Sequence, residues 1–272
     1  MVITNNCRNE WNQQQILKII TGINNFEVQT VSNITYAAQV TQVSYLDVAA
    51  NPKLIQRIKQ ITNLPICISS IDPSIIYKCL MNGADIVEIG NYDIFYEYKH
   101  LFSVARILTI VQEIQENFPN TKLCVTIPHH LTIKEQITLT QKLTILGIKY
   151  LQTEGIYSQH QFFNNNYILS NTLAKVSATL STTYALSKTT GQSIMTASGI
   201  TQSTASLAIK YGATGIGISS LIMKMKNSAD MVIMISLIKN LMLKDNMNII
   251  KYNLSHLSLT PNFSSVKHPT LC

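Results

Sequence analysis

The chain has 272 residues, of which 46% are hydrophobic and only 13% are charged. This composition supports a sizeable core, which excludes an intrinsically disordered protein and a small disulfide scaffold. The most apolar stretch, at 231–235, is followed by Ser236 and Lys239 and falls far short of the roughly 20 residues that cross a bilayer, so we expect a soluble protein with no membrane span.

The net charge of +7 comes almost entirely from lysine, because the chain has 18 lysines and 3 arginines. These residues are scattered, and no two of them are adjacent. Base readout and bidentate phosphate recognition favour arginine, usually in a basic stripe with aromatic residues. The sequence therefore predicts a solvated basic surface and no nucleic-acid partner.

Residue usage points to an origin rather than to a chemistry. Isoleucine occurs 38 times and asparagine 23 times, and lysine replaces arginine almost throughout. The codons of these residues are A/T-rich, which indicates an AT-rich genome such as that of an organelle. Five cysteines without a C-x-x-C pair indicate reduced thiols, two of them buried at Cys67 and Cys124. The N-terminal residues resemble neither a signal nor a transit peptide, so we expect synthesis inside the organelle.

Short apolar runs alternate with segments of helical periodicity along the whole chain. Pro52 is placed as a helix N1 residue, Asp72 begins a helix, and Gly83 and Gly147 are helix stops. In chain order, the predicted strands lie at 18–23, 45–50, 64–70, 85–90, 122–128, 150–154, 192–198 and 214–219. The predicted helices lie at 33–42, 52–62, 72–82, 103–117, 132–146, 173–189, 202–211 and 230–244.

Eight strand–helix units are the number in a closed parallel (β/α)8 barrel, and the chain has the size of such a barrel. An open doubly wound sheet usually begins with a G-x-G-x-x-G turn, whereas the first turn here is Gly22-Ile-Asn-Asn. We therefore predict a single α/β domain, a parallel (β/α)8 TIM barrel of the aldolase-like kind, over 1–254. A polar insertion is expected at 159–166, and an irregular C-terminal tail at 255–272.

Strand parity predicts which side chains point into the barrel, since successive residues face opposite sides. Burying a carboxylate without a partner costs several kcal/mol, and the C-terminal end of the strands is where TIM barrels carry their active sites. Three predicted inward acids, Asp47, Glu88 and Glu154, are therefore candidate catalytic residues; the alternative is a polar plug that only closes the barrel. Other predicted inward residues are Ala49, Ile86, Gly90, Cys124, Thr126, Pro128, Gln152, Thr196, Ser198, Gly217 and Ser219.

Two histidines follow the fifth predicted strand, and His129 is a candidate acid or base beside the acids. No H-x-x-x-H or H-E-x-x-H spacing supports a metal, so none is predicted, and a loop histidine is the alternative. Lys18 is placed at the start of the first strand, the wrong end of the barrel for a Schiff base.

A glycine- and serine-rich pattern follows the seventh and eighth predicted strands. Many barrels bind phosphate there, between two loops and the N-terminus of a short extra helix, predicted here at 221–226 with Ser220 as its cap. Glycine lets backbone N–H groups approach an anion, and serine supplies hydroxyls. The predicted phosphate-binding residues are Ser198, Gly199, Gly217, Ser219 and Ser220, and plain turn chemistry is the alternative.

Five segments together resemble a known family: KIITGINNF at 18–26, ADIVEIGNYD at 84–93, VTIPH at 125–129, LQTEG at 151–155 and TASGI at 196–200. The chain is similar, from about residue 10 to 255, to the proteins called hypothetical chloroplast open reading frame 23, which algal plastids encode and cyanobacteria also contain. The resemblance implies a plastid location. It implies no reaction, so it assigns no catalytic roles.

Three functions remain open from the sequence. The first is an enzyme acting on a phosphorylated small metabolite or using flavin mononucleotide (FMN), in which Asp47, Glu88 or Glu154 transfers protons, with or without His129. FMN or no cofactor is expected. The second is a non-catalytic, regulatory barrel that binds such a ligand. The third is structural assembly in the plastid. Turnover separates the first two, because Glu88→Gln and Glu154→Gln should abolish conversion in an enzyme and only alter affinity in a binding protein.

Overall fold

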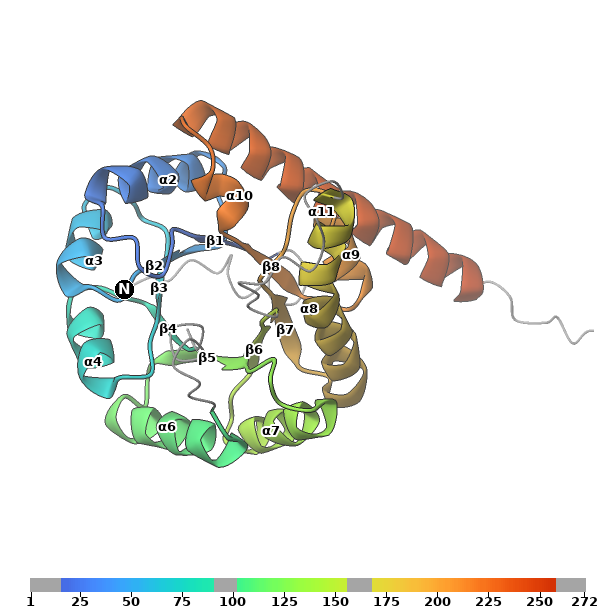
Figure 1. Ribbon diagram of the computed structural model, residues 1–272, viewed down its shortest axis with the longest axis horizontal. Coiled ribbons are helices and arrows are strands. Elements are labelled where there is room, and N and C mark those ends of the chain that lie inside the picture. Colours follow the sequence, from blue (N-terminus) through green and yellow to red (C-terminus); the bar gives the residue numbers. More distant parts are fainter. Residues whose placement is uncertain (1–15, 91–101, 156–167, 258–272) are drawn as a thin grey trace, which may run out of the picture.

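The computed structural model describes residues 16–90, 102–155 and 168–257, and describes side chains there outside 168–175 and 244–257. Eight parallel strands close into a barrel in the order β1 to β8, with a ring of helices outside it (Figure 1). The predicted (β/α)8 TIM barrel is therefore confirmed. The predicted insertion at 159–166 and the tail beyond 257 lie outside the described residues.

The strands that form the closed barrel are short, with four to six residues each. They are β1 (Ile16–Ile20), β2 (Tyr45–Val48), β3 (Ile66–Ser69), β4 (Ile86–Ile89), β5 (Lys122–Ile127), β6 (Tyr150–Thr153), β7 (Ser193–Thr196) and β8 (Gly215–Ile218). The predicted first strand began two residues late, which matters for the site. Closure pairs β1 with β8 and sets Lys18 beside Gly217.

The described helices follow the strands and begin at residues that suit a helix start. They are α2 (Val28–Val40), α3 (Pro52–Lys59), α4 (Pro73–Met81), α6 (Val104–Asn117), α7 (Ile133–Ile145), α8 (Ile168–Thr190), α9 (Ala205–Lys210), α10 (Ser220–Met223) and α11 (Ser228–Leu257). Asn51 and Asp72 cap α3 and α4 through their side chains, and Thr132 forms a capping box with Glu135 on α7.

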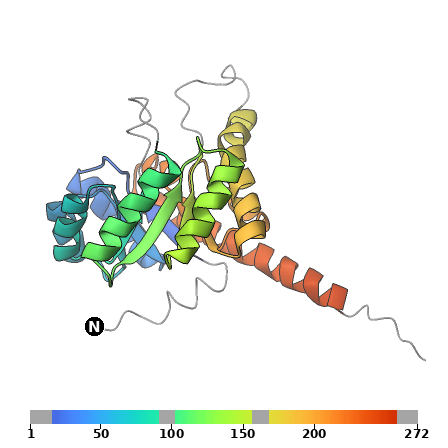
Figure 2. The same cartoon turned by 90° about the horizontal axis from the view of Figure 1, so that it is seen from below.

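The last helix is longer than the sequence predicted. α11 packs against α2 and α9, so it closes the ring between the first and last units, and its C-terminal part extends beyond the barrel body (Figures 1 and 2). Lys239 of α11 donates to the backbone carbonyls of Thr41 and Gln42 at the end of α2. No helix among the described residues has the length and apolar character needed to cross a membrane.

The apolar core has two parts. The larger part fills the space between strands and helices, where residues such as Leu46, Val87 and Val125 alternate with inward-facing neighbours. The smaller part lies inside the barrel and consists of Ile16, Tyr45, Cys67 and Met195, with Ile86 packed against them. These residues stand in the early part of their strands, so apolar side chains plug the N-terminal end and leave the C-terminal end for polar ones.

Candidate functional site

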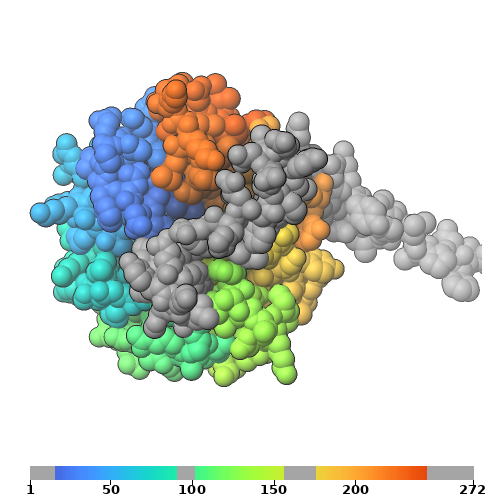
Figure 3. Space-filling view, viewed as in Figure 1, coloured from blue at the N-terminus to red at the C-terminus, as the bar shows by residue number. Residues whose placement is uncertain are grey.

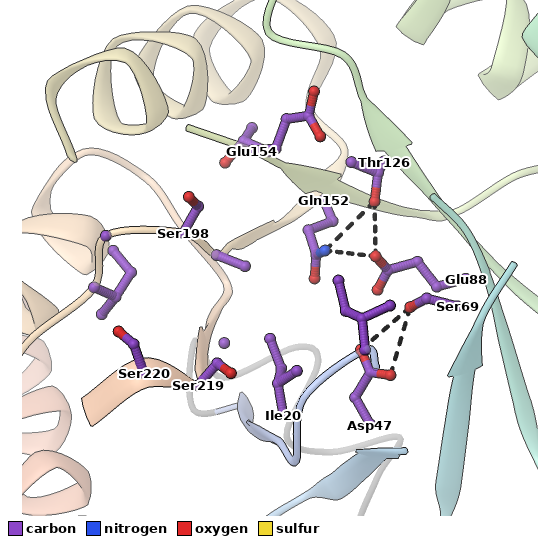
Figure 4. Close-up of a pocket in the computed structure, with 16 residues that line it drawn as sticks. Ile20, Asp47, Ser69, Glu88, Thr126, Gln152, Glu154, Ser198, Ser219 and Ser220 are labelled. Carbon is purple, nitrogen blue, oxygen red and sulfur yellow. Dashed lines mark hydrogen bonds between the residues drawn. The ribbon is translucent and has the colours of Figure 1, made fainter. Parts of the chain in front are cut away.

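A cavity of about 270 Å³ opens at the C-terminal mouth of the barrel, and its lining comes from or directly after all eight strands (Figure 4). Eight of the nine residues singled out from the sequence line it together: Asp47, Glu88, Glu154, Ser198, Gly199, Gly217, Ser219 and Ser220. His129, the ninth, does not line the cavity but contacts Glu154. The structure thus brings these eight residues together around one cavity, and their roles stay predictions.

Below the cavity, Lys18 joins the two innermost carboxylates. Its Nζ donates to Asp47 Oδ2 at 2.9 Å and to Glu88 Oε2 at 2.7 Å, and the side chain is 0% exposed. The predicted placement of Lys18 at the wrong end of the barrel is therefore wrong: β1 begins at Ile16, so Lys18 is its third residue and points inward. The two acids thus have a cationic partner that the sequence prediction did not assign to them.

Burial and charge act in opposite directions on this group. Burial alone lowers the pKa of the Lys18 ammonium, but Asp47 and Glu88 raise it well above its ordinary value, so Lys18 is a cation. Burial raises the pKa of Asp47 from 3.8 to about 6, although Lys18 opposes the shift. Asp47 therefore exchanges a proton near neutral pH while lining the cavity, as a general acid or base must.

The raised pKa of Asp47 makes stability depend on pH. A carboxyl group whose pKa is higher in the folded than in the unfolded state makes the free energy of unfolding depend on pH. Its contribution to stability is fully present below about pH 4 and is lost as the pH rises through about 6. We expect Asp47→Asn to remove that loss and to be more stable than the wild type at pH 8, by up to about 3 kcal/mol. Urea unfolding between pH 4 and 8 measures it, with Glu113→Gln on the exposed face of α6 as control. Equal pH slopes in Asp47→Asn and wild type would contradict the assignment.

Glu88 is held by three donors. Besides Lys18, Thr126 Oγ1 donates at 2.8 Å and Gln152 Nε2 at 2.6 Å, both to Oε1 (Figure 4). Among the described side chains, the Asp47 carboxylate accepts hydrogen bonds only from Lys18 and from the Ser69 hydroxyl. Ser69 Oγ lies 3.4 Å from Asp47 Oδ1 and 3.3 Å from Oδ2. Glu88 is thus a fixed anion inside a hydrogen-bond network, whereas Asp47 has oxygen lone pairs left for a ligand.

Glu154 follows β6 and pairs with His129 rather than with the buried charges. Its Oε1 accepts from the backbone N–H of His129 at 2.9 Å and lies 3.0 Å from His129 Nδ1. In Figure 4 its carboxylate points away from those of Asp47 and Glu88. His130 lies 3.0 Å from the carbonyl of Phe102, and burial lowers its pKa. The Glu154–His129 pair therefore stands at the rim of the cavity, apart from the buried charges.

The glycine- and serine-rich side of the cavity has an unusual backbone. Ser198 and Gly199 both have positive φ, 75° and 72°, a conformation that a non-glycine residue rarely adopts. A Cβ on Gly217 would come within 3.0 Å of Ala197 Cβ and 3.2 Å of Lys18 Cε, so the missing side chain leaves room for the lysine stem. This strained turn holds a hydroxyl at the cavity wall opposite the carboxylates.

Two local predictions on this side were wrong. The extra helix, α10, is a single turn that begins at Ser220 with Ser219 in the cap position, and no side chain caps it. It lies beside α11 and against the loop after β1, where a Cβ on Gly22 would meet Met223 (Figures 1 and 3). Thr196 points outward, because its hydroxyl pairs with Thr183 of α8 at 2.8 Å. On β7 the inward position belongs to Met195 instead.

A metal does not suit the buried acids as they stand. Asp47, Cys67 and Glu88 bring ligand atoms within 4.8 Å of one another. However, the Lys18 ammonium lies between the two carboxylates, and burial raises the pKa of the Cys67 thiol well above its ordinary value. A divalent cation would have to displace a charged lysine and ionise a buried thiol.

The residues that support these acids were not among the predicted site residues. Lys18 was not counted as a site residue because the first strand was predicted to begin at residue 18 instead of residue 16. Thr126 and Gln152 were predicted to point inward, but no role was assigned to them. Ser69 was not singled out at all, although it ends β3 at the level of Glu88. The available signal was polarity: four polar residues at inward positions of strands whose other residues are mostly apolar.

The closed parallel barrel with a polar cavity at the C-terminal mouth defines an aldolase-like TIM barrel. Similar solved structures include thiamine phosphate pyrophosphorylase from Pyrococcus furiosus. It has 13% sequence identity and a TM-score of 0.57, and the match covers 86% of this chain and 98% of that one. Another is (S)-3-O-geranylgeranylglyceryl phosphate synthase from Thermoplasma acidophilum, in complex with sn-glycerol-1-phosphate, at 11% identity, TM-score 0.57, and coverage of 89% and 98%. A third, the aldolase QR15, has 15% identity and TM-score 0.52, over 91% and 98%.

The chain belongs to the family described as Protein of unknown function (DUF561), whose model matches residues 3–248. Relatives named Uncharacterized protein ycf23 are 42% identical in Pyropia yezoensis, over 88% of this chain and 86% of that protein, and 34% identical in Cyanophora paradoxa, over 85% and 93%. The resemblance stated from the five sequence segments is therefore confirmed.

Proposed function

We propose that this protein is an enzyme acting on a phosphorylated small molecule. In this proposal, Ser198, Gly199, Gly217, Ser219 and Ser220 hold the phosphate, and Asp47 transfers a proton on the remainder of the ligand. One observation carries the proposal: a single cavity is lined on one side by a carboxyl group that titrates near pH 6 and on the other by a glycine- and serine-rich wall.

Two further observations support a small phosphorylated ligand. Two of the solved structures with this fold are named for thiamine phosphate and for a glyceryl phosphate, and phosphate binding after strands seven and eight recurs among TIM barrels. The cavity volume, about 270 Å³ for the described residues, lies at the lower end of ligand sites. A compact metabolite therefore suits the site better than FMN, which stays the alternative ligand.

The location belongs to the same proposal. The relatives carry the name ycf23 and come from algae such as Pyropia yezoensis and Antithamnion sp.. Together with the A/T-rich residue usage, this supports a protein that is encoded and works in the plastid, in the stroma.

Ligand release from native protein tests the proposal. We expect native mass spectrometry of protein isolated from its own organism to show a bound mass that denaturation releases as a phosphate monoester. Visible flavin absorbance of the same sample would identify FMN instead. An empty protein that also shows no thermal shift with any phosphate monoester would contradict the phosphate site.

The serine hydroxyls allow a sharper test of the phosphate wall. We expect Ser219→Ala combined with Ser220→Ala to weaken binding of the released ligand about a hundredfold or more, since each of the two lost hydrogen bonds to an anion is worth about 1.5–3 kcal/mol. Stability should change little, because neither side chain caps α10. Titration calorimetry measures the affinity, and Ser203→Ala, outside the cavity, is the control. Unchanged affinity in the double variant would place the phosphate elsewhere.

A non-catalytic, ligand-binding barrel is the second candidate. The buried ion pairs favour it, because Lys18 and Glu88 are already paired with protein groups and need no ligand to complete them. Turnover separates the candidates: Asp47→Asn should remove most of the conversion if the protein is an enzyme and only change affinity if it is a binding protein.

A further inference from the structure

The amide of Gln152 has a fixed orientation. Its Nε2 lies 2.6 Å from Glu88 Oε1 and 3.4 Å from Thr126 Oγ1. Glu88 Oε1 can only accept, and the Thr126 hydroxyl already donates its proton to the same oxygen at 2.8 Å. Both neighbours therefore require the N–H side of the amide, which turns the carbonyl oxygen away from them.

That oxygen, Gln152 Oε1, is a buried acceptor without a hydrogen-bond partner among the described residues. The side chain is 6% exposed and lines the cavity, and Figure 4 shows the oxygen on the cavity side of the amide. Leaving a buried polar atom unpaired costs about 1–3 kcal/mol, so such an atom needs an explanation. A ligand that donates a hydrogen bond at this point supplies one.

The rest of the cavity floor has the same polarity. Asp47 also lines the cavity, and apart from the bond to Lys18 its carboxylate oxygens accept only long hydrogen bonds from Ser69. No lysine or arginine is among the described residues that line the cavity. Hydrogen-bond donors lie on the opposite wall instead, as the hydroxyls of Ser198, Ser219 and Ser220. The floor accepts hydrogen bonds, and the far wall donates them.

We propose that Gln152 Oε1, together with Asp47, selects ligands that carry a hydroxyl or amino group at the end opposite their phosphate. This inference rests on the proposed phosphate site and names the class of its ligand: a compact phosphate monoester with a hydrogen-bond donor on its second or third carbon. Gln152 is a specificity-determining residue in this arrangement, and Glu88 and Thr126 position it by fixing its amide.

Four probes test the inference on the wild-type protein: inorganic phosphate, propyl phosphate, glycerol phosphate and aminoethyl phosphate. Propyl phosphate matches glycerol phosphate in charge and approximate length but has no donor beyond its phosphate. Aminoethyl phosphate has a similar length and carries an additional positive charge on its ammonium group. We expect titration calorimetry to show glycerol phosphate or aminoethyl phosphate binding about 10 to 100 times more tightly than propyl phosphate, the effect of one satisfied buried acceptor. The tighter of the two identifies the donor as a hydroxyl or an amine.

Variants assign the preference to Gln152. Gln152→Met keeps the unbranched shape without the acceptor. Because Asp47 remains in this variant, we expect it to lose most, but not all, of the preference for glycerol phosphate over propyl phosphate. Gln136→Met is the matched control, because it makes the same replacement at a buried glutamine that does not line the cavity, and it should keep the preference. If Gln152→Met does not fold, the comparison of esters on the wild type still decides.

The outcomes separate the two proposals. Equal affinity for all three esters would retain the phosphate site and overturn the role of Gln152. A preference for glycerol phosphate that is undiminished in Gln152→Met would also overturn it. If none of the four probes binds, the phosphate site fails, and the inference that rests on it fails too.

Discussion

Replacing Lys18 with methionine is expected to lower the free energy of unfolding by about 3–5 kcal/mol at pH 8, the usual cost of removing one partner from a buried ion pair. The change removes the cation shared by Asp47 and Glu88, which lie 2.9 and 2.7 Å from its Nζ. Methionine fills the volume of the lysine stem, so the loss reports charge rather than a cavity. Urea unfolding monitored by circular dichroism measures it.

Two further variants show whether charge is the cause. Adding Asp47→Asn and Glu88→Gln to Lys18→Met removes the uncompensated carboxylates, and we expect the triple variant to recover most of the loss. Lys59→Met is the matched control, because Lys59 pairs with Asp85 at 2.5 Å but both side chains are more than a fifth exposed. Such a pair contributes at most about 1 kcal/mol. Equal losses in the Lys18 and Lys59 variants would mean that the buried ion pairs do not stabilise the fold.

The fold was predictable because each strand–helix unit is specified by its own sequence. Apolar runs between helix-period segments, with Pro52, Asp72 and Gly147 at helix ends, determine eight units without reference to one another. Once eight parallel strands are present, closure buries both edges, and few alternatives remain. The bounds of the elements differ mainly at helix ends, where capping and packing rather than periodicity decide the last residues.

The site was predictable only as far as parity could be read. Asp47 and Glu88 lie in four-residue strands and are each flanked on both sides by apolar residues, Leu46 with Val48 and Val87 with Ile89. These flanking residues mark the helix side, so the inward direction of the two acids follows from alternation. On β7, Ser193-Ile-Met-Thr offers apolar residues at both parities, and the structure turns Met195 inward and Thr196 toward Thr183. One residue of register decided that error.

The pairing of Lys18 could not be read from the sequence for a different reason. The residue contacts partners 29 and 70 positions away, across strands whose relative heights depend on the stagger of the closed barrel. Inward parity would place its stem in the barrel, but only the register of β1 with β2 and β8 brings its ammonium to the level of the acids.

The two buried carboxylates, equivalent in the sequence, have different environments in the structure. The Glu88 carboxylate accepts hydrogen bonds from Lys18, Thr126 and Gln152, and these three donors hold it in place. Asp47 faces the cavity with weaker protein contacts and has its pKa raised to about 6, chiefly by burial. Neighbouring groups whose environments differ in this way divide the work of a site, one as a fixed charge and one as the group that moves a proton. Asp47 is therefore the residue on which proton transfer should depend.

Asp47→Asn is expected to lower kcat/KM by about 10² to 10⁴-fold on the phosphate monoester that the wild type converts, since this is the usual contribution of a general base. For a base, the ionised form is active, so the wild-type kcat/KM should rise with pH and level off above about 6, the pKa of Asp47. In Asp47→Asn the residual activity should lose that step, whereas Glu113→Gln should keep both rate and profile. Asparagine cannot exchange a proton but preserves the side-chain shape, so ligand affinity should change far less than turnover. A variant with wild-type kcat/KM and an unchanged profile would exclude Asp47 as the base and assign the proton transfer to another group of the site.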